Sequence, residues 1–369
     1  MKKRARDIGK KNRRDTLIII AIVVVLIPLV YFLVKWVDPG YTREPYTREE
    51  WVLDDYVTIT AYGKDRGRVE EAVGAAFEEI FHVDSVANRY NSDSELALLN
   101  EKAANEPVAV SDDLWDMIAG GMEVYEASGG LFDITVGPLV DLWDVSGRYE
   151  SGDPPPSEEE IESARERVGA NMLSLEEARH TVFFSRDGMV VDLGGLAKGY
   201  ALDRAAEAMS VDAVDAAVID MISTSMTMGN KPEALGGPRW RIAIINPRGE
   251  GFMGELLVPG GSLISTSGDY QRYFEYGGKR YHHILDVRTG YPARGVISVT
   301  VIGSGVDGAW SDAISTAAFV MGVPEALDWL GAQQGLEAII VDGDGVVHTT
   351  PGIGEWVLEL KDNIDLGNG

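Results

Sequence analysis

The feature that most constrains this chain is an apolar run near its N-terminus, residues 17–34, which spans 18 residues without a charged side chain. A helix of that length is just long enough to cross a hydrocarbon core of about 30 Å. Residues 1–36 also hold nine Lys/Arg and only two Asp/Glu, and basic residues flanking a span stay in the cytoplasm. We therefore expect a cytoplasmic basic tail at 1–16, a transmembrane anchor at 17–35, a linker at 36–48 and one folded domain at 49–369.

A cleaved signal peptide is the alternative interpretation of this segment. The residues that follow the apolar run, Lys35 to Asp38, offer no small-residue cleavage site. The chain also contains no Cys, which excludes disulfides, a thiolate metal site and an anchor on a lipid-modified cysteine. We therefore expect a single-pass protein of the cell membrane whose folded domain lies outside the cytoplasm.

Charge is distributed very unevenly along the chain. The net charge is −26 overall and +7 over residues 1–36, so the remaining residues carry −33. A field of that sign repels nucleic acid and anionic lipid. We therefore expect no nucleic-acid partner.

Hydrophobic periodicity predicts a mixture of strands and helices. Alternating or short apolar runs predict strands at 57–62, 181–184, 189–192, 217–221, 240–245 and 298–302, with a hairpin turn at 342–345. Helical spacing predicts helices at 69–86, 112–128, 157–168, 197–209, 310–321 and 324–333. The mixture is typical of one α+β domain.

The glycine-rich run at 303–308 fits the GxGxxG pattern of dinucleotide-binding loops, after a predicted strand and before a predicted helix. Such a domain also needs an acidic residue at the end of a second strand about 20 positions later, and the sequence has none there. Too few residues follow the loop to complete a doubly wound domain. We interpret the run as a turn that precedes the helix.

Two motifs point to phosphate and metal chemistry. Asp312 and Thr316 lie four apart on a predicted helix, so a carboxylate and a hydroxyl share one face. Oxygen ligands suit Mg²⁺, although such a pair is usually a surface or capping feature. The segment 192–200, DLGGLAKGY, places two glycines and a lysine at a helix start, where backbone N–H groups favour phosphate oxygens. A tight strand-to-helix turn is the alternative there.

A pair of adjacent histidines, His282 and His283, supplies a candidate base. In a strand, neighbouring side chains point to opposite faces, so only one of the two can enter a site. A histidine beside a phosphate site can act as general base or stabilise charge.

Taken in order, six segments resemble the ApbE family of FAD:protein FMN transferases along nearly the whole chain after residue 50. The matches are RYNSDSEL (89–96) with LN (99–100), GLFDITVGPL (130–139), DLGGLAKGYALD (192–203), STSGDY (265–270), HILD (283–286) with RTGYP (288–292), and SDA (311–313) with STA (315–317). The resemblance implies a single ApbE-like, T-fold-related α+β domain with mixed and antiparallel sheets, preceded here by one N-terminal transmembrane helix.

The resemblance also implies an activity and its site. The family moves FMN from FAD to a Thr or Ser hydroxyl of an acceptor protein, releases AMP and needs Mg²⁺. Implied Mg²⁺ ligands are Asp312, Thr316 and the backbone carbonyl of Gly195. The implied flavin site is lined by Tyr90, Leu131, Phe132, Asp133, Asp192, Lys198 and His283. His283 and Asp286 are the implied catalytic residues, with the identity of the base left open between them.

Acceptors of this family carry an Asp-Gly-x-Ser/Thr-Gly-Ala-Thr type motif. This chain contains no such motif, so we expect its partner to be a separate extracytoplasmic flavoprotein and not the chain itself.

The chain departs from the family pattern after its central strand. Where the family has Gly-Gly-Asn or Gly-Gly-Asp, this chain has Ile222, Ser223 and Thr224. Side chains at these positions are expected to crowd the pocket and to weaken FAD binding or transfer. Two alternatives therefore stay open: an FAD pyrophosphatase that yields FMN and AMP, and a non-catalytic flavin-binding protein.

Overall fold

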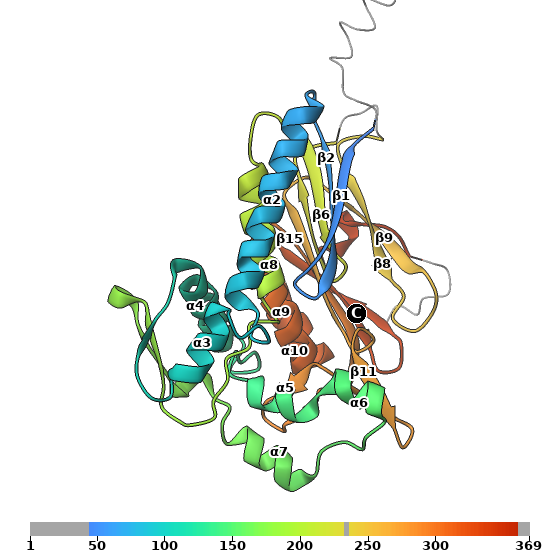
Figure 1. Ribbon diagram of the computed structural model, residues 1–369. Helices are drawn as coiled ribbons and strands as arrows, with labels where there is room; N and C mark the ends of the chain where they lie inside the picture. Colours follow the sequence, from blue (N-terminus) through green and yellow to red (C-terminus); the bar gives the residue numbers. More distant parts are fainter. Residues whose placement is uncertain (1–43, 232–235, 361–369) are drawn as a thin grey trace, which may run out of the picture.

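The computed structural model describes residues 44–231 and 236–360 (Figure 1). The predicted basic tail, anchor and most of the predicted linker lie outside the described residues. Within them, no helix is long and apolar enough to cross a membrane. The first strand begins at Tyr46, inside the segment 36–48 expected to be linker. The other domain boundaries stay predictions.

An eight-stranded sheet forms the centre of the domain, and all its ladders are antiparallel. In sheet order the strands are β1 (Tyr46–Val52), β2 (Asp55–Tyr62), β6 (Ala216–Met221), β7 (Thr224–Met228), β10 (Ser262–Gly268), β15 (Val296–Ser304), β16 (Leu336–Asp342) and β17 (Val347–Thr349). In β2 the alternating residues Val57, Ile59 and Ala61 are buried, as a half-covered strand requires.

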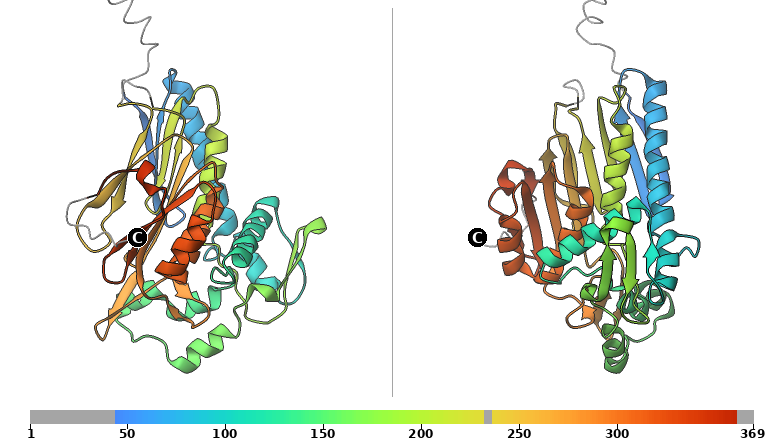
Figure 2. Two further views of the ribbon diagram at one scale, coloured as in Figure 1. Left: turned by 180° about the vertical axis from the view of Figure 1, so that it is seen from behind. Right: turned by 90° about the vertical axis from the view of Figure 1, so that its left-hand side faces the viewer.

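Helices cover one face of this sheet, where they bury the main hydrophobic core (Figures 1 and 2). They are α2 (Arg66–Ala87), α8 (Ala197–Met209), α9 (Gly308–Met321) and α10 (Val323–Gly331). Asp65 caps α2 by accepting hydrogen bonds from the Gly67 and Arg68 N–H groups, which otherwise have no partner in the helix. The apolar stripe of α2 then packs inward at helical spacing, for example through Val73, Phe77 and Ile80.

A second, smaller sheet packs on the opposite face (Figure 2). Its strands, in order, are β18 (Val357–Leu360), β9 (Phe252–Val258) and β8 (Trp240–Ile245). Trp240 and Leu256 from this sheet bury against Ile264 and Ile339 from the main sheet. The central strands are therefore covered on both faces, which explains why β15 is buried along almost its whole length.

A helical region lies at one end of the sheet (Figure 1). It contains α3 (Glu95–Lys102), α4 (Asp112–Ala127), α5 (Gly137–Trp143), α6 (Val145–Ser151), α7 (Glu158–Arg165) and the three-stranded sheet β3 (Val108–Ala109), β5 (Thr181–Phe184) and β4 (Leu173–Glu176). Two short hairpins, β11 (Tyr273–Tyr276) with β12 (Lys279–His282) and β13 (Leu285–Asp286) with β14 (Tyr291–Pro292), complete it. Trp143 anchors this region, since its indole N–H donates to the Gly290 carbonyl at 2.7 Å.

Most of the predicted elements are confirmed, and one is wrong. The six predicted helices correspond to α2, α4, α7, α8, α9 and α10, and residues 342–345 form the turn between β16 and β17. The predicted strand at 189–192 is absent; only an isolated bridge joins Val190 to Val136. The side chain of Asn100 hydrogen-bonds the Val191 backbone, so an amide side chain stands where a neighbouring strand was expected.

The GxGxxG run joins β15 to α9, as the simpler interpretation required. The strand pairs antiparallel on both sides, so it does not belong to a parallel βαβ unit. Glycine matters at the crossing of the two helices behind the loop. A Cβ on Gly199 of α8 would lie 1.9 Å from the Gly308 carbonyl oxygen at the start of α9. Only glycine therefore lets α8 and α9 approach this closely.

Candidate functional site

The side chain of Asp312 is the buried anion at the centre of the site. It projects from α9 and accepts hydrogen bonds from Thr224 Oγ1 at 3.1 Å and from the Gly199 N–H at 3.3 Å. Burial raises the pKa of the carboxyl, and the charge of Lys198 with the two hydrogen bonds opposes that rise. The carboxylate is thus held by donors from α8 and from the start of β7.

Thr316 lies one turn further along α9, beside the glycine pair that precedes α8. Its Oγ1 is 3.0 Å from Ser267 Oγ on β10. A Cβ on Gly195 would lie 3.9 Å from that same Oγ1 and 2.9 Å from Cε2 of Phe132. The fold therefore brings the predicted residues Gly195, Thr316 and Phe132 together.

The donors gathered here are a carboxylate, a hydroxyl and a backbone carbonyl, and all are oxygen. This set suits Mg²⁺, which is commonly held by one or two carboxylates while substrate phosphates and water complete its shell. Across residues 44–231 and 236–360, no group of three His, Cys, Asp or Glu side chains is placed to hold a metal by itself. The residues present therefore fit a cation that shares its coordination with a phosphate-bearing substrate.

Lys198 supplies the positive charge at the start of α8. Its Nζ lies 3.6 Å from Asp55 Oδ2 and donates a hydrogen bond to Ser223 Oγ. Burial raises the pKa of Asp55, and the Lys198 charge opposes that rise. The ammonium is therefore held between β2 and the β6–β7 hairpin, next to the carboxylate of Asp312.

That hairpin contains the departure from the family pattern. Ile222 and Ser223 form its two-residue turn, with Met221 paired to Thr224. Ile222 has φ of 45°, a strained value for a β-branched residue, and its side chain is 54% exposed. Ser223 is buried, and its carbonyl accepts from the Thr266 N–H at 2.7 Å. Of the side chains at the two turn positions, only that of Ser223 reaches Lys198.

The two adjacent histidines have different environments. His282 is buried against Phe319, its Nε2 lies 2.8 Å from the Ala293 carbonyl, and burial lowers its pKa to about 4. His283 is half-buried with Nδ1 3.2 Å from the Arg272 carbonyl. Burial lowers its pKa to about 3, and the nearby positive charges, including Lys198, act in the same direction. Of the pair, only His283 has a pKa affected by the charge of Lys198, and it is a neutral imidazole at neutral pH.

Asp192 joins the glycine pair to an arginine that the sequence did not single out. Its Oδ1 accepts from the Gly194 N–H at 2.8 Å, and its Oδ2 lies 2.6 Å from Arg89 Nε. Arg89 also lies against the ring of Tyr90 and pairs with Asp141 at 2.7 Å. Tyr90 is 75% exposed, which leaves most of its ring free to contact a ligand.

Three other predicted residues have local roles. Leu131 is buried in the main core. Asp133 is buried, and its carboxylate accepts from Thr135 and from the Ala170 N–H, so its oxygens hold the surrounding loop. Asp286 is paired in a bidentate arrangement with Arg288 at 2.9 and 3.0 Å. The structure therefore does not gather Asp133 and Asp286 with the oxygens around Asp312, and their assignment as site residues stays a prediction.

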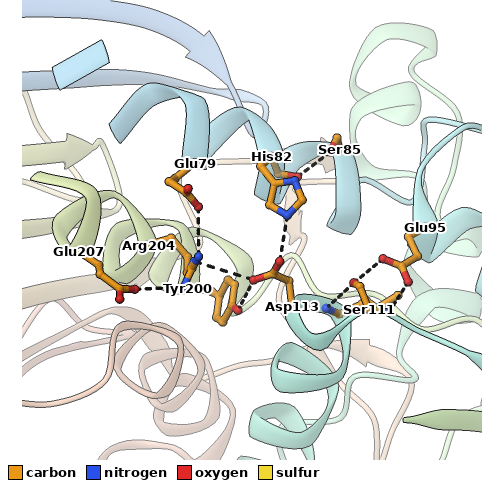
Figure 3. Close-up of polar contacts among 10 residues, drawn as sticks. Glu79, His82, Ser85, Glu95, Ser111, Asp113, Tyr200, Arg204 and Glu207 are labelled. Carbon is orange, nitrogen blue, oxygen red and sulfur yellow. Dashed lines mark hydrogen bonds and ion pairs between the residues drawn. The ribbon is translucent and has the colours of Figure 1, made fainter. Parts of the chain in front are cut away.

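A polar network supports α8 from behind (Figure 3). Tyr200 donates to Asp113 at 2.7 Å, and His82 lies 2.9 Å from the same carboxylate. Arg204 pairs with Glu79 at 3.4 Å and with Glu207 at 3.0 Å. These contacts tie α2, α4 and α8 together, which fixes the helix whose first turn carries Lys198.

The sequence alone did not assign a role at the site to four residues: Thr224, Ser267, Asp55 and Arg89. Arg89 and Ser267 lie inside quoted segments, but spacing alone does not show which side chain turns toward the site. Ser265 and Ser267 alternate along β10 and both meet α9, at Ser311 and at Ser315 and Thr316. Two serines spaced two apart in a strand point to the same face of the sheet. This spacing is the signal in the sequence that could have indicated their contact with the hydroxyls of the helix.

Comparison with known proteins agrees with this architecture. The model of the ApbE family matches residues 53–340. The FAD:protein FMN transferase of Treponema pallidum is 32% identical over 331 residues, 85% of this chain and 89% of that protein.

Two solved structures have the same fold. The ApbE protein of Thermotoga maritima superimposes with a TM-score of 0.76 at 32% identity, covering 86% of this chain and all of that chain. The flavin transferase ApbE of Vibrio cholerae has a TM-score of 0.71 at 25% identity, covering 85% and 99%. The match extends over nearly the whole described domain and includes its site, so the chain belongs to the ApbE family.

Proposed function

We propose that this chain transfers FMN from FAD to a Thr or Ser hydroxyl of an acceptor protein, with Mg²⁺ as cofactor and AMP as the released product. The observation that carries the proposal is the grouping of Asp312, Thr316 and Gly195 with Lys198 beside them. Oxygen ligands for a hard cation next to an ammonium are what the splitting of a pyrophosphate requires. The name of the Treponema pallidum relative supports the same reaction.

The residues of the chain would each contribute a defined interaction. Asp312, Thr316 and the Gly195 carbonyl would hold Mg²⁺, which neutralises charge on the phosphates when bound. The ammonium of Lys198 and the N–H groups at the start of α8 would bind phosphate oxygens. The exposed Tyr90 ring would contact the flavin. Little covalent work is left to the enzyme, since positioning and charge stabilisation dominate phosphoryl transfer.

We also propose that His283 orients the acceptor hydroxyl. Its neutral ring can accept a hydrogen bond, and its low pKa of about 3 keeps it uncharged at physiological pH. Asp286 is a weaker candidate for this role because Arg288 occupies both of its oxygens.

We further propose that the domain works outside the cytoplasm, held to the cell membrane by the apolar run at 17–34. The basic flank and the absence of a cleavage site support this placement. The partner would be an extracytoplasmic flavoprotein with the acceptor motif named above. An alkaline phosphatase fusion to the chain tests this orientation: activity is expected outside the cytoplasmic membrane, and a product recovered in the soluble fraction would contradict the anchor.

The activity test combines the full chain with FAD, Mg²⁺ and an acceptor domain that carries the motif, and follows AMP release and acceptor mass. Covalent FMN on the acceptor that requires Mg²⁺ is the expected result. AMP without acceptor modification would instead support the pyrophosphatase. FAD binding with neither product would leave a non-catalytic flavin-binding protein.

A further inference from the structure

We infer that Ser223 is itself an acceptor, so that the chain attaches FMN from FAD to its own Ser223 Oγ. The inference rests on the proposed function, since the same site would perform the transfer. It would make this chain a covalent flavoprotein.

The Ser223 hydroxyl lies against the lysine at the start of α8. Ser223 Oγ accepts a hydrogen bond from Lys198 Nζ, the ammonium expected to bind the phosphates. The next residue, Thr224, donates to Asp312 at 3.1 Å. Two adjacent residues of the hairpin therefore contact the cation expected to bind phosphate and the expected metal carboxylate. A phosphate bound by the Lys198 ammonium would therefore lie close to the Ser223 hydroxyl.

Ser223 is also fixed in place. The pairing of Met221 with Thr224 closes the hairpin, and the Ser223 carbonyl accepts from the Thr266 N–H at 2.7 Å. The side of the hairpin that carries Ser223 is buried, with 7% of that residue exposed. The strained φ of 45° at Ile222 persists because its surroundings hold it, and such strain clusters at functional positions.

Ser223 also differs from a separate acceptor in how its hydroxyl reaches the site. A separate acceptor must bring its hydroxyl to the site, and its motif serves that purpose. A hydroxyl that already belongs to the site needs no motif, because an intramolecular group reacts as if it were present at very high concentration. The absence of the acceptor motif from this chain is therefore no obstacle to modification at Ser223. In the family pattern, with glycine at this position, no such hydroxyl exists.

The step balances without any further reactant. A bond forms between Ser223 Oγ and the phosphorus on the FMN side of the pyrophosphate. The bond from that phosphorus to the oxygen bridging to AMP breaks, and AMP leaves. The hydroxyl proton is released to water, and no group changes oxidation state. The product is a phosphodiester between serine and riboflavin.

The test incubates the purified full chain with FAD and Mg²⁺ in the absence of any acceptor. Intact-mass measurement is expected to show a gain of one FMN less one water, and peptide mapping to place it on Ser223. The denatured chain should keep flavin fluorescence. The rate should not depend on protein concentration, since the reaction is intramolecular.

Matched variants distinguish the loss of the Ser223 hydroxyl from a general disturbance of the hairpin. Ser223→Ala should lose the adduct, and Ser223→Thr should restore at least part of it because a hydroxyl returns. Ser225→Ala, two residues along the same hairpin, should keep the adduct. Circular dichroism of each variant controls for folding. If Ser223→Ala does not fold, the comparison of Ser223→Thr with the unmodified chain shows whether a hydroxyl at this position carries the adduct.

The outcomes are distinguishable from those for the proposed function. An acceptor domain that gains FMN while the chain itself does not would overturn this inference and leave the transferase intact. An adduct on any other residue, or a rate proportional to protein concentration, would also overturn it. If neither the acceptor nor the chain is modified, the proposed function fails together with the inference.

Discussion

The side-chain amide of Asn100 makes two hydrogen bonds with the backbone of Val191, one to its carbonyl at 2.9 Å and one from its N–H at 2.8 Å. Val191 is fully buried, so these bonds satisfy groups that no water can reach. They anchor the segment that leads directly to Asp192 and Gly195. A residue on α3 thereby sets the position of the glycine pair at the site.

Asn100→Ala should therefore destabilise the fold and loosen the site. Two buried backbone groups lose their partners, and each unsatisfied group costs about 1–3 kcal/mol. We expect a clear fall in the free energy of unfolding in urea and a higher Mg²⁺ requirement for AMP release. Asn105→Ala, an exposed residue after the same helix, is the control and should change neither. Equal stability of the two variants would contradict the role of Asn100.

The same contact shows where sequence reasoning stops. The apolar run at 189–192 has the composition of a strand, but a strand forms only where a neighbouring backbone pairs with it. Here the side chain of Asn100 hydrogen-bonds the Val191 backbone instead. Helices were easier to predict because their amphipathic stripes and caps are local, as in α2 and α4. In the main sheet, β2 pairs with β6 and β7 pairs with β10. These strands are far apart in the sequence, so no local pattern predicts their pairing.

The site residues also fall into those that local sequence predicts and those that it does not. Asp312 and Thr316 were predictable because a spacing of four on a helix fixes their common face. Thr224 and Asp55 were not, because each reaches the site through strand pairing far away in the sequence. The expected crowding by Ile222 comes from the departure from the family pattern, whereas the exposure of its side chain depends on the φ value at the hairpin turn.

Ser267 should act as a positioning residue for the expected metal ligand Thr316. Its hydroxyl lies 3.0 Å from Thr316 Oγ1, so Ser267→Ala leaves that side chain free to rotate. We expect the Mg²⁺ concentration for half-maximal AMP release to rise about 10-fold, as is typical when a partner of a metal ligand is lost. Ser265→Ala, which removes the parallel contact to Ser311, is the control. A similar change in both variants would argue against a specific role for Ser267.

Asp203 should make stability depend on pH. Burial, with the charge of Asp307 acting in the same direction, raises its pKa to about 7 from an ordinary value of 3.8. Between these values the folded chain holds a proton that the unfolded chain has lost, so this contribution to stability is present at low pH and disappears as pH rises toward 7.

Asp203→Asn cannot titrate and removes this dependence. The stability of the variant relative to the unmodified chain should therefore increase from pH 5 to pH 8. The expected increase is about 1 kcal/mol or more, since one pKa unit corresponds to about 1.4 kcal/mol. Urea unfolding of both proteins at the two pH values measures this increase. If the difference in free energy of unfolding between them were the same at pH 5 and pH 8, Asp203 would titrate normally.

Tyr200→Phe tests the network behind α8. The phenol donates to the Asp113 carboxylate at 2.7 Å, and loss of a hydrogen bond to a charged group costs about 1.5–3 kcal/mol. We expect a lower midpoint of unfolding but little change in FAD affinity, because the phenol points toward Asp113 at the start of α4 and hydrogen-bonds there rather than to an expected metal ligand (Figure 3). Tyr149→Phe, at an exposed ring, serves as the matched control and should be neutral.

The role of Asp312 as a metal ligand is tested by comparing Asp312→Asn with Asp328→Asn in the same assay of covalent FMN on an acceptor domain. Asp328 lies exposed on the neighbouring helix α10, so its substitution controls for the loss of one charge. Loss of a metal ligand should slow transfer by more than the roughly 10- to 100-fold seen when only a supporting residue is removed. We predict such a loss for Asp312→Asn and none for Asp328→Asn. Equal transfer by both variants would contradict the assignment of Asp312 and, with it, the account of this site.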